Sequence, residues 1–386
     1  MILSGVNFPP KLIDAAEQGN LVVFAGAGVS MGEPSNLPSF WKLAEDIARG
    51  FGYEPKEPLD QFLGSLSPDE SVIQNATVNT LQSINSQPKE LHSHLLNMFT
   101  SSGSVRVVTT NFDPLFTEAS SNIWTNKPEI YTAPALPLGY DFEGIVHIHG
   151  ANTNPKSIVV TDRGFGKAYL TDGWASRFLM QMFETYTVLF VGYSHDDMVM
   201  SYLARALPDK AKGKRFALVG SETKNQDSKW QSLGIEPVYF PQEHEHDYDE
   251  LSSSTKALSD FLRRRPSDWQ EHIGRIAEQD GPLDLEDEHA IQHALNDVAK
   301  VRYFTSRATS EKWAFWLHDQ DASSEARKHF KDCLSEDPRD KFCSRVFSIV
   351  ETCKMRGLSS FALLKQIVAD VKALLPYPDV FGLASG

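Results

Sequence analysis

Cysteine is scarce in this chain. Its 386 residues include three cysteines, Cys333, Cys343 and Cys353, all in the last quarter. No Cys-x-x-Cys pair occurs, which excludes a structural zinc module of that type. Because the surrounding sequence has a helical pattern, we expect these thiols to be buried or half-buried small side chains.

Long apolar runs and positive charge are lacking too. No apolar run approaches the roughly 20 residues that cross a bilayer, so no membrane insertion is expected. The formal net charge is -14, which disfavours nonspecific binding to nucleic acid or to anionic membranes. Residues 1–18 lack the basic flank and long apolar centre of a signal peptide, so the cytoplasm is the expected location.

Short apolar runs alternate with helical patterns over the first two-thirds of the chain. This alternation predicts an α/β fold, a Rossmann-like doubly wound parallel sheet. The predicted strands are residues 21–24, 105–112, 144–150, 157–160, 187–194, 215–220 and 236–240. A helix over 251–265 is expected to close a first domain, residues 1–265, and Pro266 to break that helix. Residues 266–386 predict an all-α second domain, and the lack of a charged or capped finish suggests a piece of a longer chain.

The first predicted strand runs into a glycine turn. Residues 21–30 read LVVFAGAGVS, and an amphipathic helix is expected over 38–52. Gly26 and Gly28 can take positive φ and offer bare N–H groups to a phosphate. The alternative is an ordinary turn between a strand and a helix.

Polar residues follow the later strands. Asn111 and Asp113 end the second strand, although Asp113 before Pro114 is also an ordinary helix N-cap. In the third strand, one of His147 and His149 is expected to point into the crevice and the other into packing. His149, at the strand's end, is the candidate for chemistry, and a buried, hydrogen-bonded histidine is the alternative. His92 and His94 are expected to be surface histidines rather than a metal pair.

Four motifs in this order, GAGVS, TTNFDPL, HIHG and GYS, resemble the sirtuin-like (Sir2) NAD-consuming family over about residues 10–265. The resemblance implies that the glycine turn holds the NAD pyrophosphate, that a Thr-Asn-Asp motif binds the nicotinamide ribose side, and that a histidine is the catalytic base. It also implies that a Gly-x-Ser motif binds the dinucleotide. By position in the motifs, the resemblance gives the pyrophosphate role to Gly26, Ala27, Gly28 and Ser30 and the ribose role to Thr110, Asn111 and Asp113. It gives the role of the base to His149 and the second dinucleotide contact to Gly192 and Ser194.

The sequence departs from the deacetylases of that family at two points. Their Pro-Asp-Phe-Arg segment is Pro38-Ser39-Phe40-Trp41 here, so that only the Phe and the leading Pro remain. Their four zinc-binding cysteines are missing from the matching domain. These departures resemble the sirtuin-like NAD hydrolases of bacterial anti-phage systems, and the helical region is similar to the one that follows such domains. Phe40 is expected to shield the reacting centre.

The resemblance implies an NAD⁺ glycohydrolase that releases nicotinamide and ADP-ribose, with NAD⁺ as substrate and no zinc. His149, Asn111 and Asp113 are the expected catalytic residues, and the ordinary histidine pKa near 6.5 suits a base at cellular pH. NAD-dependent deacylation or ADP-ribosylation, and an NAD- or ADP-ribose-sensing module, stay open as alternatives. Because unrestrained NAD loss is toxic, we expect homo-oligomerisation or a phage-derived or co-encoded protein activator to control the enzyme.

Overall fold

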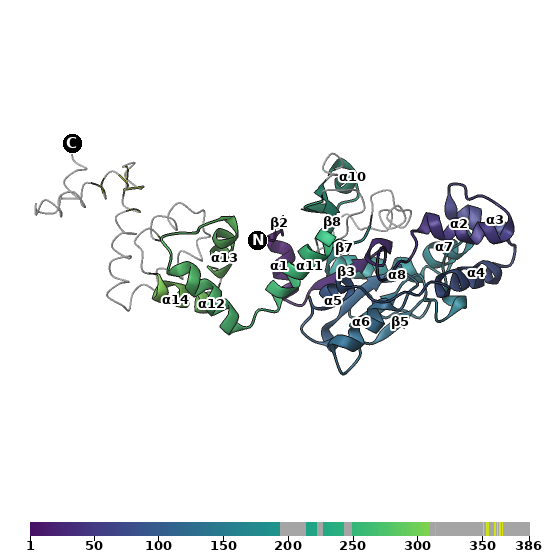
Figure 1. The fold of residues 1–386 in the computed structure, drawn as a ribbon, viewed down its shortest axis with the longest axis horizontal. Helices are drawn as coiled ribbons and strands as arrows, with labels where there is room; N and C mark the ends of the chain where they lie inside the picture. The colour runs from purple at the N-terminus through teal and green to yellow at the C-terminus, as the bar shows by residue number, and fades with distance from the viewer. Residues whose placement is uncertain are drawn as a thin grey trace, which may run out of the picture. The chain divides into compact units, whose positions relative to one another are not determined.

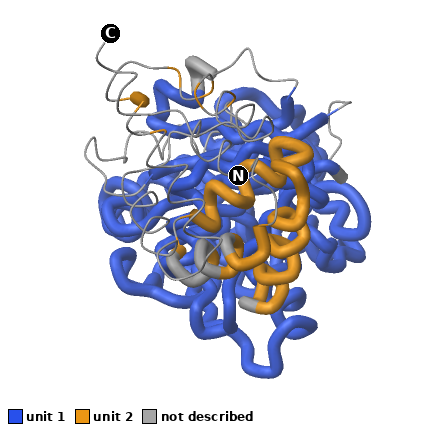
Figure 2. Tube along the Cα trace, turned by 90° about the vertical axis from the view of Figure 1, so that its left-hand side faces the viewer, with its two compact units in different colours: residues 1–263 blue, residues 264–386 orange. Residues whose placement is uncertain are grey.

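The computed structural model describes residues 1–193, 214–221, 227–242, 249–295 and 297–308, together with scattered positions beyond 308. The chain divides into two compact units, Met1–Arg263 and Arg264–Gly386 (Figure 2). No helix among the described residues is long and apolar enough to cross a membrane.

The first unit is built on a seven-stranded parallel sheet (Figure 1). Its strands lie in the order β5-β6-β4-β3-β7-β8-β9. These strands are β3 (Leu21–Ala25), β4 (Arg106–Thr109), β5 (Ile130–Thr132), β6 (Gly144–His147), β7 (Thr187–Val191), β8 (Arg215–Gly220) and β9 (Glu236–Phe240). β3 lies between β4 and β7, so the strand order reverses beside it, and this is where open α/β sheets bind ligands.

The helices of the first unit flank the sheet and extend beyond one end of it. They are α1 (Pro10–Glu17), η1 (Ala27–Val29), α2 (Phe40–Phe51), α3 (Leu59–Leu66), α4 (Glu70–Gln82), α5 (Glu90–Leu96), η2 (Ser102–Ser104), α6 (Leu115–Ile123), η3 (Pro155–Ser157), α7 (Asp162–Gly166), the π-helical turn η4 (Lys167–Thr171), α8 (Trp174–Thr185), α10 (Asp227–Ser232) and α11 (Asp249–Leu262). A small antiparallel hairpin, β1 (Ile2–Leu3) with β2 (Val6–Asn7), precedes them.

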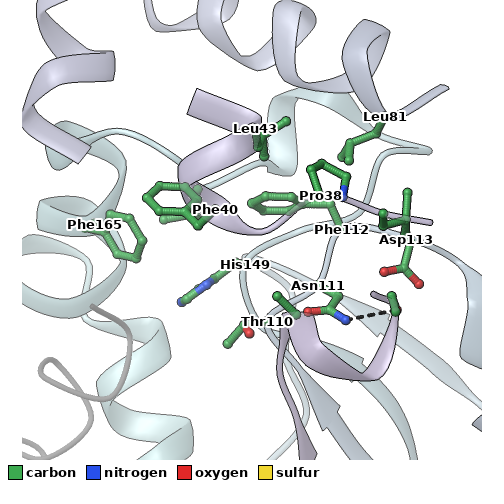
Figure 3. A pocket seen from close by; sticks show the side chains of 14 residues that line it. Pro38, Phe40, Leu43, Leu81, Thr110, Asn111, Phe112, Asp113, His149 and Phe165 are labelled. Atoms are coloured by element: carbon green, nitrogen blue, oxygen red, sulfur yellow. Dashed lines mark hydrogen bonds between the residues drawn. The ribbon is translucent and has the colours of Figure 1, made fainter. Parts of the chain in front are cut away.

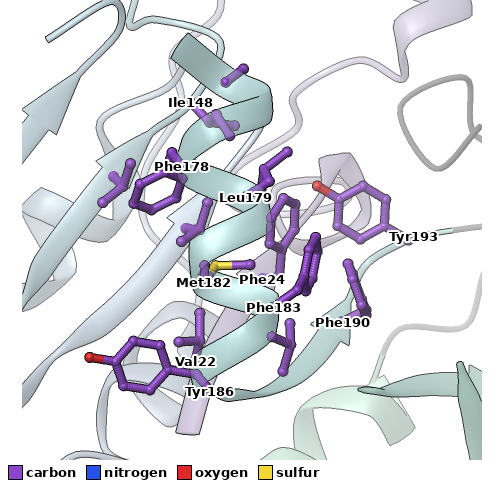
Figure 4. Close-up of a cluster of buried hydrophobic side chains, with 14 of the residues drawn as sticks. Val22, Phe24, Ile148, Phe178, Leu179, Met182, Phe183, Tyr186, Phe190 and Tyr193 are labelled. Carbon is purple, nitrogen blue, oxygen red and sulfur yellow. The ribbon is translucent and has the colours of Figure 1, made fainter. Parts of the chain in front are cut away.

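The sheet is covered on both faces. Every residue of β3 is buried, although side chains alternate between the two faces of a strand. Val22 and Phe24 pack with Phe183 and other residues of α8 in one apolar cluster (Figure 4). α1, α5, α6 and α11 pack on one another, and α1 also contacts β3 and β7. The doubly wound Rossmann-like α/β fold that the alternation predicts is confirmed.

A second apolar cluster joins α2, α3 and α4 to the sheet's carboxyl edge. Leu43, Leu63 and Ile73 of these helices pack with Ile158 and Val160, which follow the last residues of β6. Ser39 caps α2, and Gly52 ends it with φ 75°, as the Pro and Gly signals around this helix indicate. The helices therefore cover the end of the sheet at which the ligand-binding residues were expected.

Most predicted elements form, but their ends differ. β8 and β9 have the predicted bounds, whereas β4, β6 and β7 each end three residues earlier than predicted. The predicted strand over 157–160 is wrong, because those residues form part of η3 and an extended segment that packs under α2–α4. β5 and the β1–β2 hairpin were not predicted, since their apolar runs are only two or three residues long.

The described part of the second unit is helical. It contains α12 (Pro266–Ala277), α13 (Leu285–Ala294) and α14 (Val298–Arg307). Trp313 is buried against these helices, and its Nε1 donates to the carbonyl oxygens of Ala277 and Gln279 at 3.1 and 2.9 Å. Cys353 is buried, as predicted, and Cys333 and Cys343 lie outside the described residues.

Candidate active site

The candidate site lies where β3, β4 and β6 end side by side. Ala25, Thr109 and His147 are register partners across these three strands. The segments that continue from them are the glycine turn, residues 110–113 and residues 148–150. Because the strands are parallel, all three segments leave the same edge of the sheet.

These segments and the covering helices enclose one pocket (Figure 3). It holds about 700 Å³ of space, part of it open to solvent. A mostly apolar wall with a few polar groups is typical of small-molecule sites. The lining residues are Ala27, Ser30, Leu37, Pro38, Phe40, Leu43, Leu81, Thr110, Asn111, Phe112, Asp113, His149, Val159 and Phe165.

The glycine turn packs against the end of β7. The N–H groups of Gly26 and Gly28 donate to the carbonyl oxygens of Val191 and Gly192, at 2.9 and 3.0 Å. The prediction that these two glycines offer bare N–H groups is therefore wrong. Neither glycine has a positive φ. Both positions require glycine for steric reasons, because a Cβ on Gly26 would lie 2.8 Å from Gly192 O and one on Gly28 would lie 2.9 Å from Gly192 Cα.

Gly192 meets the glycine turn from the other side. It has φ +75°, and a Cβ there would lie 2.6 Å from the backbone nitrogen of Val29. The neighbouring Tyr193 hydroxyl lies 2.7 Å from Thr110 Oγ1 and donates to Ala25 O at 3.2 Å. These contacts lock the ends of β3, β4 and β7 together. Ser194, the other predicted residue here, lies outside the described residues.

Asn111 is fixed by its side-chain nitrogen. Nδ2 donates to Gly26 O at 3.0 Å and to Ser30 Oγ at 3.2 Å, which uses both of its hydrogens. The amide oxygen Oδ1 is then the atom that this side chain offers to a ligand. The backbone is also held, because Asn111 N donates to Thr109 Oγ1 at 3.0 Å and Asn111 O lies 3.2 Å from His147 Nδ1.

Asp113 is both a helix cap and a pocket residue. Its Oδ1 accepts from Leu115 N at 3.1 Å, as the N-cap alternative predicted, and the same carboxyl lines the pocket. Burial raises the pKa of Asp113 to about 6, although hydrogen bonds from Leu115 and the Ser30 hydroxyl oppose that rise. The carboxyl is thus poised to change charge just below neutral pH.

His92 is fully buried next to this group, so the prediction of a surface histidine is wrong for it. Its Nδ1 accepts from Lys89 N at 3.2 Å, so the neutral ring carries its hydrogen on Nε2, which lies 3.2 Å from Ser30 Oγ. Burial lowers the pKa of His92 to about 3. His94, on the same helix, is half-buried and pairs with Ser252 at 3.3 Å.

His149 lines the pocket with Phe165, whereas His147 turns to the backbone of Asn111. The His149 side chain is buried, and its Nε2 lies 2.8 Å from the Tyr169 hydroxyl. Burial lowers the pKa of His149 to about 3, so the expected ordinary histidine pKa is wrong. At neutral pH the ring is a neutral imidazole, present entirely as the base.

Aromatic rings form the opposite wall. Phe40 and Phe112 project into the pocket above His149 and Asn111 (Figure 3). Pro38 lies beside Phe112, and Phe40 lies on the side of Phe165 (Figure 3). None of the lining residues is Lys or Arg, so an anionic group here would depend on backbone and neutral donors.

No cluster of three or more His, Cys, Asp or Glu side chains with the arrangement of a metal site occurs in the described part of the chain. Sequence reasoning missed Tyr169, Tyr193 and His92, which lie 20 to 83 residues from the groups that they contact. An isolated Tyr or His carries no local signal of such a partner.

The fold is a doubly wound α/β sheet with a pocket at the carboxyl edge of β3, β4 and β6, and part of it matches a known family. Residues 105–238 match the model of the SIR2-like domain family, a stretch that holds Asn111, Asp113, His149 and Gly192 but not the glycine turn. Such a domain implies the involvement of NAD.

A curated relative extends further along the chain. The chain is 29% identical over 346 residues to "Uncharacterized protein y4cA" of Sinorhizobium fredii (strain NBRC 101917 / NGR234). The match covers 80% of this chain and 28% of that relative, so the chain spans little more than a quarter of the relative's length.

Proposed function

We propose that this protein is an NAD⁺ glycohydrolase that cleaves NAD⁺ to nicotinamide and ADP-ribose. The observation that carries the proposal is the convergence of Asn111, Asp113 and His149 in one pocket, at the strand ends of a sheet with a SIR2-like match. Three side chains with complementary chemistry enter the cavity from two adjacent strands, β4 and β6.

The chemistry of the bond suits these groups. Nicotinamide leaves as a neutral molecule, so the reaction needs little acid, and positive charge develops on the ribose. The Asp113 carboxylate can stabilise that charge, and Oδ1 of Asn111 can orient water or a ribose hydroxyl. His149 can then accept the proton that the attacking oxygen loses.

The low pKa of His149 has two consequences. The basic form is fully populated at neutral pH, and the base is weaker than an ordinary imidazole. We therefore assign it a proton transfer late in the reaction, after the attacking oxygen has begun to bond to the ribose and has become acidic. Phe40 and Phe112 would exclude bulk water from the cation.

The test is nicotinamide release from NAD⁺ by the purified protein and by His149→Ala and Asn111→Ala. Each variant should lose about 10²- to 10⁴-fold in kcat, the range of a general base or an orienting group. His94→Ala is the matched control, because His94 is half-buried on α5 and does not line the pocket. Near-normal release by both pocket variants would overturn the proposal.

Two further measurements separate the alternatives. Tight NAD⁺ binding by calorimetry without nicotinamide release would favour a sensing module. Turnover of an acyl-lysine peptide, or transfer of ADP-ribose to protein, would favour a deacylase or a transferase.

We also propose that the activity depletes NAD in anti-phage defence. The support is the departure from the deacetylase pattern at residues 38–41 and the absence of zinc-type cysteine pairs. The second unit would mediate self-association or receive a phage-derived or co-encoded activator. Light scattering should give a homo-oligomer, and a strain that carries the protein should lose NAD on infection while one with His149→Ala does not.

A further inference from the structure

The hydroxyl of Tyr169 lies 2.8 Å from Nε2 of His149. Both side chains are buried, and they come from separate segments, His149 from the end of β6 and Tyr169 from the π-helical turn η4. The rings meet edge to face, with centroids 5.9 Å apart and planes at 69°. The contact therefore fixes both the position and the orientation of the imidazole.

The surroundings of Tyr169 hold it in place. Its ring belongs to the apolar cluster over α8, and it stacks on Phe165 with centroids 6.1 Å apart. Its carbonyl oxygen accepts a hydrogen bond from Ser176 Oγ. Because ring and backbone are both anchored, the hydroxyl is a fixed partner for His149.

The contact occupies one ring nitrogen of His149 and leaves the other for the pocket. In a neutral imidazole one nitrogen carries hydrogen and the other has a lone pair. Since Nε2 faces Tyr169, Nδ1 is the nitrogen left for a proton from the pocket, and it has no hydrogen-bond partner among the described residues. Nδ1 is a base only when the hydrogen sits on Nε2, which then donates to the Tyr169 oxygen.

We infer that Tyr169 is a positioning residue, which holds His149 as the Nε2–H tautomer and so keeps Nδ1 as the proton acceptor. This inference rests on the proposed NAD⁺ hydrolysis. The attacking water loses its O–H bond to Nδ1 as its oxygen bonds to C1′ of the ribose. The C1′–N bond breaks, its electron pair leaves with nicotinamide, and His149 later releases the proton to solvent.

The first experiment needs no turnover. The protein is labelled with ¹⁵N-histidine, and NMR identifies the protonated ring nitrogen of His149, whose signals are assigned by their loss in His149→Gln. We expect hydrogen on Nε2 in the wild type and a loss of this preference in Tyr169→Phe, which keeps the ring but lacks the hydroxyl. Hydrogen on Nδ1 in the wild type would overturn the inference without any variant.

The second experiment measures nicotinamide release by Tyr169→Phe. We expect kcat to fall about 10- to 100-fold, part of what a general base contributes, while KM changes less than about 2-fold. Tyr186→Phe is the control, since Tyr186 lies in the same cluster and its hydroxyl donates to Tyr140 O at 3.2 Å, away from His149. A rise in KM together with a fall in kcat, shared by both variants, would mean a structural role and overturn the inference.

The two experiments separate the two claims. Absence of nicotinamide release by the wild type would count against the proposed hydrolysis alone, because the tautomer of His149 would still decide the role of Tyr169. Unchanged kcat and tautomer in Tyr169→Phe, with an active wild type, would count against the inference alone.

Discussion

His92 Nε2 lies 3.2 Å from Ser30 Oγ, so a buried histidine of α5 supports the serine that ends the glycine turn. Ser30 Oγ also accepts from Asn111 Nδ2 at 3.2 Å, and its own hydrogen bonds to the Asp113 carboxyl. One serine hydroxyl thus connects three side chains that are distant in sequence. Its two acceptor positions and its one donor position are all in use.

His92→Phe should weaken this network. Phenylalanine keeps the edge contact with Phe116, at 4.9 Å between ring centroids, but loses both ring nitrogens. We expect the free energy of unfolding to fall by about 1–3 kcal/mol, because the Lys89 N–H and the Ser30 oxygen lose their partner in a buried site. Urea denaturation measures this change.

A double-mutant cycle with Ser30→Ala assigns the loss to this pair. The coupling energy between the two substitutions should be about 0.5–3 kcal/mol, the range for residues in one hydrogen-bond network. Additive effects of the two substitutions would show that His92 acts through packing alone.

Gly28→Ala should damage the turn through a backbone clash. The added methyl would meet Gly192 Cα at 2.9 Å and Gly192 O at 3.0 Å, where no flexible side chain can move aside. We expect the free energy of unfolding to fall by about 1–3 kcal/mol, which is the usual effect of overpacking a tight interior. NAD⁺ binding, measured by calorimetry, should weaken as well.

Gly50→Ala is the matched control for that substitution. Gly50 lies in α2, and a Cβ there meets nothing within 4 Å. Alanine should raise the free energy of unfolding by about 0.5–1 kcal/mol, because glycine loses more backbone freedom in a helix. If the two alanine variants behaved alike, the close approach of the glycine turn to Gly192 would not matter to stability.

Asp113 should make the protein less stable as pH rises. Burial raises its pKa from the ordinary value of 3.8 to about 6, so the folded state holds the proton more tightly. Stability from this group is therefore complete below pH 3.8 and is lost as pH rises through about 6. Relative to Asp113→Asn, the wild type should lose about 1.4 kcal/mol between about pH 5 and pH 7.5.

Urea denaturation of both proteins at the two pH values tests this prediction. Taking the difference between the two proteins removes the opposite contributions of His92 and His149, whose folded-state pKa values are lowered. A difference that stays constant with pH would contradict a raised pKa at Asp113. The variant should also lose NAD⁺ hydrolysis, since a neutral amide cannot stabilise the ribose cation.

Much of the fold follows from local patterns. The apolar runs that became β8 and β9 are bounded by charged and turn residues, so their ends are visible in sequence. β4 and β6 stop earlier than predicted, because the chain leaves the sheet to form the pocket while its residues stay apolar or buried. The run at 157–160 is apolar because it packs under α2–α4, and burial alone does not distinguish that from a strand.

Sequence by itself determined where most of the strands lie along the chain and which polar residues follow them. Parallel strands then bring Asn111, Asp113 and His149 to one edge. Only the tertiary structure decided which of their atoms are available and in what charge state. Hydrogen-bond partners such as Tyr169 and His92, and the desolvation that shifts the pKa values of Asp113 and His149, depend on segments distant in sequence, which meet only when the core forms.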